Sequence, residues 1–366
     1  MSAQRIIALL GRRDHPTDAV EEYCRYLGQA LADRSFALEI RRVPWDEHGW
    51  GSSLNALKLQ AQAWRGVWVL VQYTALAWSM RGFPRRFLAA LRILRSAGCR
   101  VAIVYHDVVP FGGARLIDRF RRAHQLRVMR AAQLLADKTV LTIAFDHVSW
   151  LSGSLENAAF VPVGANLPFP LPLQDHDPLH SPPTVGIFGV TGGLAGDRET
   201  RDIVATLRHA SQQLGALRLL VFGRNANQRE AELRAGLKGA PVEVQVEGVV
   251  EDKDLPVRFA AMDLLLFVRG QISSRRGSAI AGIACGVPVI AVQGDETASP
   301  ITESGVLLLR EEVCDDIRQR ALGEAVVKVL ADQQLRVDLV RRNRAVLESD
   351  FCWPSIAKRY AEFLRT

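Results

Sequence analysis

Short apolar runs in the first half of the chain alternate with longer stretches in which apolar residues recur every three or four positions. The short runs are typical of strands buried on both faces, and the longer spacing is typical of helices. Alternation of the two patterns predicts parallel βαβ units. The predicted strands are R-I-I-A-L-L, A-L-E-I-R-R-V, V-W-V-L-V and V-A-I-V-Y-H-D, with helices over residues 20–33, 54–64 and 84–96.

The alternation stops in a proline-rich stretch, residues 166–183, and then resumes. A stretch with neither period is typical of a connector, and 366 residues are also enough for two domains at about 150 residues each. The expected fold class is therefore α/β, with two doubly wound Rossmann-like domains that face a central cleft. The strands predicted in the second domain are T-V-G-I-F-G-V, L-R-L-L-V-F-G, V-E-V-Q-V-E-G, D-L-L-L-F and V-P-V-I-A, with helices over residues 199–214 and 228–237.

The chain has a net charge of +7 and a pI near 9.4, which indicates an anionic partner such as nucleic acid, phosphorylated small molecules or anionic lipid. Its five cysteines form no C-x-x-C pair, so neither a disulfide framework nor a zinc site is expected, and a reduced cytoplasm is the expected location. The most apolar window, residues 67–80, is shorter than the roughly 20 residues of a membrane-spanning helix. No transmembrane helix is expected.

Polar residues follow several of the predicted strands. The carboxyl ends of parallel strands share one edge of the sheet, where ligands of such folds bind. His106 and Asp107 close one buried strand and are candidates to orient a substrate or exchange a proton. A structural histidine beside a helix-capping aspartate is the alternative. Arg224 follows another strand and is expected near the mouth of the cleft, although a solvated loop arginine is equally expected.

A glycine-rich loop, T-G-G-L-A-G-D-R, separates a predicted strand from a helix expected to begin at Glu199. Gly192 and Gly193 would let backbone N–H groups approach an anion there, and Arg198 adds positive charge. The loop matches neither of the two common glycine-rich nucleotide motifs. A flexible turn is therefore the alternative.

A second helix start is predicted within S-S-R-R-G-S-A-I-A-G-I-A-C-G-V-P, residues 273–288. Ser273 or Ser274 is expected to cap the helix, and Gly286 to end it. Unpaired N–H groups and the positive end of the helix dipole suit a diphosphate. The residues expected to bind it here are Arg275, Arg276, Gly277 and Ser278. Close packing of the small helix residues on the sheet is the structural alternative.

The order of these motifs resembles glycosyltransferase family 4, whose members are retaining enzymes of the GT-B fold. The resemblance rests on A-A-M-D-L-L-L-F and A-C-G-V-P-V-I-A, and more loosely on G-R-R-D-H-P-T-D-A-V-E, V-P-V-G-A-N and F-C-W-P-S-I-A-K-R-Y-A-E-F-L. It implies an acceptor-side domain over residues 1–165, with residues 351–366 packing back on it as a helix. It also implies a nucleotide-sugar-binding domain over residues 166–350.

The resemblance implies retaining transfer of a sugar from a nucleotide diphosphate sugar, UDP- or GDP-linked, to a glycan, lipid-linked or small-molecule acceptor. No cofactor is implied beyond this substrate. Gly11 would lie close to the donor phosphate and His106 near the transferred sugar. Arg198 occupies the position of a diphosphate-binding lysine, and Gly192 that of an arginine.

Both glutamates of the family's Glu-x7-Glu motif are missing, because Ser273 and Ala281 occupy their positions. The side chain of Ala281 accepts no hydrogen bond from a ribose, whereas Arg275 and Arg276 add charge that would stabilise the leaving diphosphate. With these arginines, and with no Asp-x-Asp arrangement of the sort that would hold a metal, no metal is expected. Two alternatives stay open: a catalytically inactive GT-B-like binding or scaffold subunit, and a sugar-nucleotide epimerase.

The acceptor is expected to enter through the loops of residues 11–18 and 73–80. Two basic segments, residues 84–95 and 115–130, interleave arginine with phenylalanine and leucine at helical spacing. They predict contact with an anionic membrane surface, at its inner face, if the acceptor is lipid-linked; ordinary surface helices are the alternative. Nucleic acid is not expected as a partner, because the arginines do not group with exposed aromatic residues.

Overall fold

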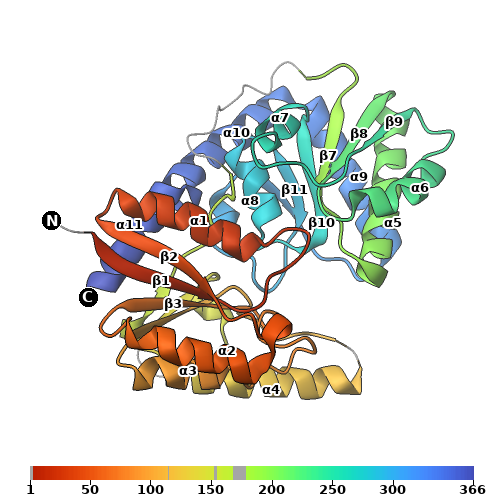
Figure 1. The fold of residues 1–366 in the computed structure, drawn as a ribbon. Helices are drawn as coiled ribbons and strands as arrows, with labels where there is room; N and C mark the ends of the chain where they lie inside the picture. The colour runs from red at the N-terminus through yellow and green to blue at the C-terminus, as the bar shows by residue number, and fades with distance from the viewer. Residues whose placement is uncertain (1–2, 114, 152–154, 168–178) are drawn as a thin grey trace. The chain divides into compact units, whose positions relative to one another are not determined.

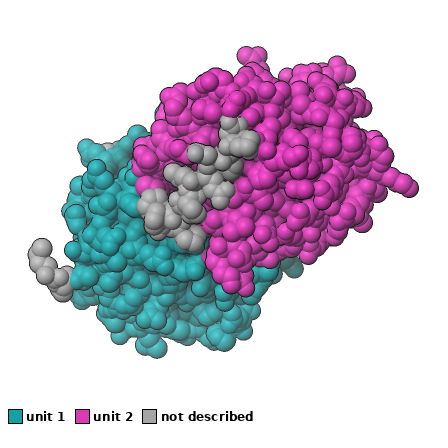
Figure 2. Space-filling model, turned by 90° about the horizontal axis from the view of Figure 1, so that it is seen from above, with its two compact units in different colours: residues 1–162, 353–366 teal, residues 163–352 magenta. Residues whose placement is uncertain are grey.

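The computed structural model describes residues 3–113, 115–151, 155–167 and 179–366, and the chain divides into two compact units. Unit 1 comprises residues 1–162 and 353–366, and unit 2 comprises residues 163–352 (Figure 2). The sequence prediction places the corresponding boundaries after residues 165 and 350. Most of the predicted connector lies outside the described residues.

Unit 1 is built on a six-stranded parallel sheet with the strand order β2-β1-β3-β4-β5-β6. The chain moves outward from β1 to β2 and then returns to β3, so the unit is doubly wound, as predicted. All residues of β3 are buried, as the continuous run V-W-V-L-V predicts for a central strand. The strands are β1 (Gln4–Leu10), β2 (Phe36–Arg42), β3 (Trp68–Tyr73), β4 (Arg100–Tyr105), β5 (Lys138–Leu141) and β6 (Ala158–Phe160).

Helices cover both faces of this sheet (Figure 1), with α2, α3 and α4 on one face and α1 and α11 on the other. Asp18 caps α1, because its carboxylate accepts hydrogen bonds from the N–H groups of Val20 and Glu21. Trp45 stacks on Trp50 and donates a hydrogen bond to the carbonyl of Ala77. Gly49, with φ 72° and ψ 158°, interrupts α2 between these two tryptophans, and the helix proper continues from there through the predicted start at residue 54. The helices are α1 (Ala19–Ala32), α2 (Trp45–Gln62), α3 (Phe87–Ser96), α4 (Leu116–Gln133) and α11 (Trp353–Arg365).

The C-terminal helix α11 is an integral part of unit 1, where it packs against α1 (Figure 1). The hydroxyl groups of Tyr23 and Tyr360 are hydrogen-bonded at 2.8 Å. The ring of Trp353 contacts the rings of Tyr23 and Tyr26, and Trp68 donates a hydrogen bond to the backbone of α11. These aromatic contacts fix the last 14 residues of the chain on the first unit.

The apolar side of α3 faces the core of unit 1. Its residues Phe87, Ala90, Leu91 and Leu94 are buried in the main hydrophobic cluster. The prediction that residues 84–95 lie on a membrane is therefore wrong, because the side that would enter the lipid already packs on the sheet. Along the described ranges, no helix combines the length and the apolar composition needed to cross a membrane.

Unit 2 contains a second six-stranded parallel sheet, with the order β12-β11-β10-β7-β8-β9. The winding direction reverses between β7 and β10. The predicted fold class, two doubly wound Rossmann-like units, is confirmed. The strands are β7 (Thr184–Phe188), β8 (Leu217–Phe222), β9 (Val242–Val246), β10 (Leu264–Gln271), β11 (Val289–Val292) and β12 (Val306–Leu309). The helices are α5 (Gly193–Leu214), α6 (Ala226–Gly236), α7 (Leu255–Ala260), α8 (Gly277–Ala284), α9 (Asp315–Ala331) and α10 (Gln333–Val346).

Helix α5 begins at Gly193, not at Glu199 as predicted. Its first turns are fixed by Arg229 of α6, which donates hydrogen bonds to the carbonyl of Gly193 and the carboxylate of Asp197. A Cβ on Gly196 would overlap the carbonyl oxygen of Thr191. The glycines that suggested a loop therefore permit close packing of a helix.

Candidate functional site

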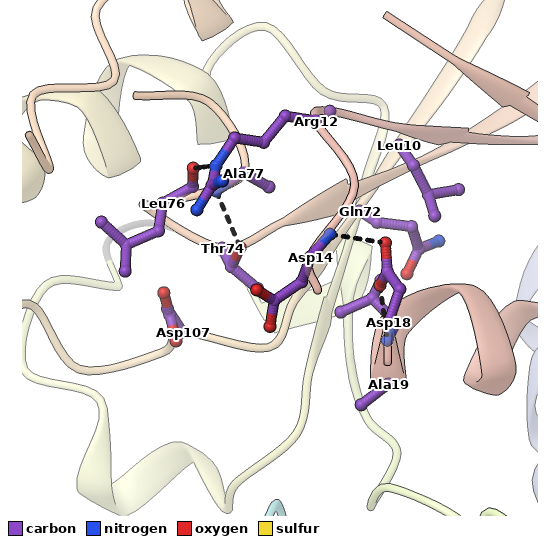
Figure 3. Close-up of a pocket in the computed structure, with 12 residues that line it drawn as sticks. Leu10, Arg12, Asp14, Asp18, Ala19, Gln72, Thr74, Leu76, Ala77 and Asp107 are labelled. Atoms are coloured by element: carbon purple, nitrogen blue, oxygen red, sulfur yellow. Dashed lines mark hydrogen bonds between the residues drawn. The ribbon is translucent and has the colours of Figure 1, made fainter. Parts of the chain in front are cut away.

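A cavity of about 260 Å³ lies at the carboxyl ends of β1, β3 and β4 in unit 1 (Figure 3). Residues of both loops that the sequence predicts to admit an acceptor, 11–18 and 73–80, line the cavity. The predicted site residue Asp107 lines it as well. The polar residues that line it are Arg12, Asp14, Asp18, Gln72, Thr74 and Asp107. Three carboxylates and an amide give this cavity many hydrogen-bond acceptors.

Gly11 is required by the close approach of these two loops. A Cβ at this position would overlap the carbonyl oxygen of Ala77, which also accepts a hydrogen bond from the N–H of Arg12 at 2.9 Å. The carbonyl of Gly11 accepts a hydrogen bond from Arg42, which also binds Asp18. The close packing of the two loops therefore explains why residue 11 is a glycine, and the shape of the cavity wall depends on this glycine.

Asp107 holds the loop that follows β3. Its carboxylate accepts a hydrogen bond of 2.8 Å from the N–H of Ala75. Arg12 donates to the carbonyl of Leu76, and Thr74 accepts from the N–H of Ala77 (Figure 3). The cavity wall is thus a hydrogen-bonded loop of defined shape.

His106 is partly exposed and does not line the cavity itself, but it contacts Gln72, which does. Its Nε2 atom lies 2.8 Å from Oε1 of Gln72, and the ring of Tyr23 meets the imidazole edge to face at 5.0 Å. Burial lowers the pKa of His106 to about 4, and the charge of Asp18 opposes this shift only in part. The ring is therefore neutral at neutral pH. Of the two predicted roles, this state favours orienting a substrate over exchanging a proton.

In unit 2, the side chain of Arg269 and the backbone of Arg224 both lie close to Gly189, at the point where the winding reverses and at the carboxyl ends of β10, β7 and β8. A Cβ on Gly189 would lie 3.4 Å from Nη1 of Arg269 and 3.7 Å from the backbone of Arg224. Burial lowers the pKa of Arg269. The negative charge of Glu199 opposes this shift, whereas the positive charge of Arg224 adds to it. The buried Nε of Arg269 has no hydrogen-bond partner in the described part of the chain. Positive charge is thus concentrated where open α/β sheets bind ligands.

Arg269 is not among the site residues predicted from the sequence, because the predicted strand ends at Phe267 whereas β10 continues to Gln271. The signal was nevertheless present. Arg269 follows a buried apolar run and reaches the same sheet edge as Arg224.

Helix α8 begins at Gly277, with Arg276 as its N-cap residue, and none of the described side chains caps it. The predicted caps Ser273 and Ser274 are wrong, because the longer β10 moves the start of the helix past them, and both serines are buried. Gly286 ends the helix with a positive φ of 76°, as predicted. Ser278 borders a small void together with Gly189 and Arg269.

The four arginines predicted to bind diphosphate differ in their surroundings. Arg275 forms a bidentate ion pair with Glu296, and Nε of Arg276 donates a hydrogen bond to the carbonyl of Gln271.

Arg198 lies within α5 and lines a separate cavity of about 300 Å³, between α5, α9 and the ends of β10 and β11. The structure thus brings Arg224 and Ser278 close to Gly189 and Arg269, but it places Arg198 in another cavity. Gly192 and Gly193 lie at the start of α5 and line neither cavity.

No protein-family model and no curated protein sequence matches this chain. Solved structures do match it over nearly its whole length. HepE of Anabaena, solved with UDP and glucose, aligns with a TM-score of 0.67 at 13% identity over 99% of both chains. A glycosyltransferase of Rickettsia africae aligns with a TM-score of 0.67 at 14% identity over 100% of both chains. A putative UDP-N-acetylglucosamine 2-epimerase of Listeria monocytogenes gives 0.61 at 12% identity, over 100% of this chain and 96% of the other. These similarities establish the GT-B fold.

Proposed function

We propose that this chain is a glycosyltransferase that moves a sugar from a nucleotide diphosphate sugar to a hydroxyl group of an acceptor, with retention at the anomeric carbon. The observation that carries the proposal is Arg269 at the reversal point of unit 2, where its side chain borders the same small void as Ser278 in the first turn of α8, with the charge of Arg224 nearby. Guanidinium groups and helix N–H groups in this position favour a diphosphate. UDP is the first donor to test, because HepE was solved with UDP and with UDP-glucose.

The arginines act mainly on the leaving group. Negative charge develops on the nucleotide diphosphate as the glycosidic bond breaks, and fixed positive charges stabilise it in the transition state. We assign this role to Arg269 and Arg276, with Arg224 adding to the local charge. Because these residues can provide the charge that a metal provides elsewhere, we expect transfer to continue in the presence of a chelator.

The acceptor is assigned to the cavity of unit 1. Its carboxylates, Asp14, Asp18 and Asp107, suit the hydroxyl groups of a glycan or of the sugar of a lipid-linked acceptor. The anionic lining disfavours an acceptor that carries phosphate at this point. Asp107 and the neutral His106 orient the acceptor or the transferred sugar.

Membrane contact is proposed for the start of α4. Leu116, Ile117 and Phe120 are exposed there although they are large and apolar, and they alternate with the exposed Arg115 and Arg119. Apolar side chains that enter the interface, with arginines among them, fit an anionic cytoplasmic leaflet. This surface would hold the protein near a lipid-linked acceptor.

The decisive experiment is titration calorimetry with UDP, UMP and uridine, followed by turnover of a panel of sugar nucleotides. We expect UDP to bind at least about tenfold more tightly than uridine, and Arg269→Ala to remove most of that difference. Equal affinity for UDP and uridine would contradict the donor site. Retention is tested by the anomeric configuration of the product in NMR spectra.

The same binding and turnover measurements distinguish a glycosyltransferase from two other functions. The similarity to the Listeria protein keeps a sugar-nucleotide epimerase as the second candidate, and this activity would give turnover without an acceptor. Binding of UDP with no turnover for any acceptor would indicate a scaffold subunit, as the missing glutamates suggest.

A further inference from the structure

The side chain of Gln72 has a defined orientation in the core of unit 1. It is 1% exposed, and its Nε2 atom donates a hydrogen bond of 3.2 Å to the carbonyl of Leu70. A carbonyl oxygen only accepts hydrogen bonds, so the amide nitrogen must face Leu70. The amide oxygen therefore faces His106.

This orientation determines which nitrogen of His106 carries hydrogen. Oε1 of Gln72 is an acceptor, so Nε2 of His106, 2.8 Å away, must donate. In a neutral imidazole the other nitrogen, Nδ1, then keeps its lone pair. The N–H of the His106 backbone donates to the carbonyl of Tyr73, so the residue is held by its backbone as well as by its ring.

We infer that Gln72 is a positioning residue that holds His106 in the Nε2–H tautomer, so that Nδ1 accepts a hydrogen bond from a substrate hydroxyl. The role toward substrate rests on the proposed glycosyltransferase function, whereas the tautomer does not. An acceptor atom on the enzyme orients a sugar hydroxyl without adding positive charge near the reacting carbon. This is useful where the transition state itself becomes cationic.

The groups around the ring support a neutral state held by Gln72. From α1, the ring meets Tyr23, whose hydroxyl is hydrogen-bonded to Tyr360, and Asp18 contributes a negative charge. The neighbouring carboxylate of Asp107 accepts a hydrogen bond from Ala75. Burial of the imidazole outweighs the charge of Asp18, so the pKa of His106 is lowered. Replacing the neutral amide by a carboxylate would change that balance.

The test is the ¹⁵N NMR spectrum of the whole chain labelled in histidine, with His106 assigned by its loss in His106→Asn. We expect a protonated Nε2 and an unprotonated Nδ1 that stay unchanged between about pH 5.5 and 8. Gln72→Glu should retain the acceptor and raise the pKa of His106 by about one unit or more. Gln72→Leu should remove the acceptor that fixes the Nε2–H tautomer, so that His106 populates the Nδ1–H tautomer as well. The matched control is Gln125→Leu, since Gln125 is also buried and hydrogen-bonded to Gly82 but should leave the spectrum of His106 unchanged.

An Nδ1–H tautomer in the wild-type spectrum, or an unchanged tautomer in a folded Gln72→Leu variant, would overturn the inference. These spectra need no substrate. A correct tautomer together with absence of turnover would contradict only the proposed function. If turnover is found, Gln72→Glu should add an acid limb to the pH profile of kcat/KM that the wild type lacks. Saturating UDP-sugar should shift the Nδ1 resonance, and an unshifted resonance would overturn the substrate contact.

Discussion

The guanidinium of Arg275 and the carboxylate of Glu296 form two parallel hydrogen bonds of 2.6 and 2.7 Å. The side chains are 18% and 17% exposed. Burial alone would raise the pKa of Glu296, but the hydrogen bonds and charge of Arg275, together with the charge of Arg276, outweigh burial, and the pKa is lowered. The positive charge of Arg275 is therefore compensated within unit 2.

We predict that Arg275→Ala acts on stability. The change leaves Glu296 partly buried without its partner, which should lower the free energy of unfolding by about 2 kcal/mol. Arg275→Ala/Glu296→Ala should recover most of this loss. Urea unfolding measures the free energy of unfolding of the single and the double variant. Arg269→Ala is the comparison, because it should weaken UDP binding while leaving the free energy of unfolding nearly unchanged. Full stability of Arg275→Ala combined with lost UDP affinity would contradict this assignment.

The ion pair illustrates what the sequence could not predict. Strands β1–β4 and β7–β11 and the end of α8 at Gly286 followed from local patterns, because apolar periodicity and a glycine with positive φ act within a few residues. The short strands β5, β6 and β12 were not predicted. Glu296 lies 21 residues from Arg275, and nothing local marks it as the partner. The start of α5 was missed for the same reason, since Arg229 of the next helix stabilises it.

Gly11 gives a prediction about the cavity wall. Gly11→Ala forces a methyl group against the carbonyl of Ala77, so we expect a loss of about 1–3 kcal/mol in the free energy of unfolding and a displaced loop at residues 73–80. Gly112→Ala is the control, because its Cβ would meet no atom within 4 Å. Thermal unfolding of the two variants should therefore differ by several degrees. Equal melting temperatures would show that the two loops separate easily.

The residues of the candidate sites were only partly predictable. His106 and Asp107 were found because they end a buried strand, which is a local signal. Gln72 is a polar residue in an apolar run and carries no local signal of a role, because its role depends on His106, which follows the neighbouring strand β4. Such pairs arise from the register between strands, which no single segment encodes.

His106 should make unit 1 sensitive to acid. Its pKa is lowered from 6.5 to about 4 in the folded state, so between these pH values the unfolded chain binds a proton that the folded chain does not. Stability therefore falls as the pH drops through this window, by up to about 1.4 kcal/mol per pH unit. His106→Gln should remove this part of the slope in urea unfolding, while exposed His48→Gln should retain it. Parallel slopes for all three proteins would contradict a His106 ring that stays neutral in the folded state.

The start of α4 gives the prediction that decides the membrane proposal. Leu116 and Phe120 are 72% and 69% exposed, and exposed arginines stand between and beside them. Leu116→Ser/Phe120→Ser should reduce flotation with vesicles that contain anionic lipid by about tenfold, because each change removes apolar area from the lipid interface. Leu134→Ser is the matched control, since Leu134 is 84% exposed at the other end of the same helix. Binding of the wild type should weaken at high salt and be absent with neutral lipid, because the arginines contribute through charge. The membrane proposal would be wrong if the wild type does not float with vesicles but forms a concentration-dependent dimer that Leu116→Ser/Phe120→Ser abolishes. That result would assign this surface to a second copy of the chain.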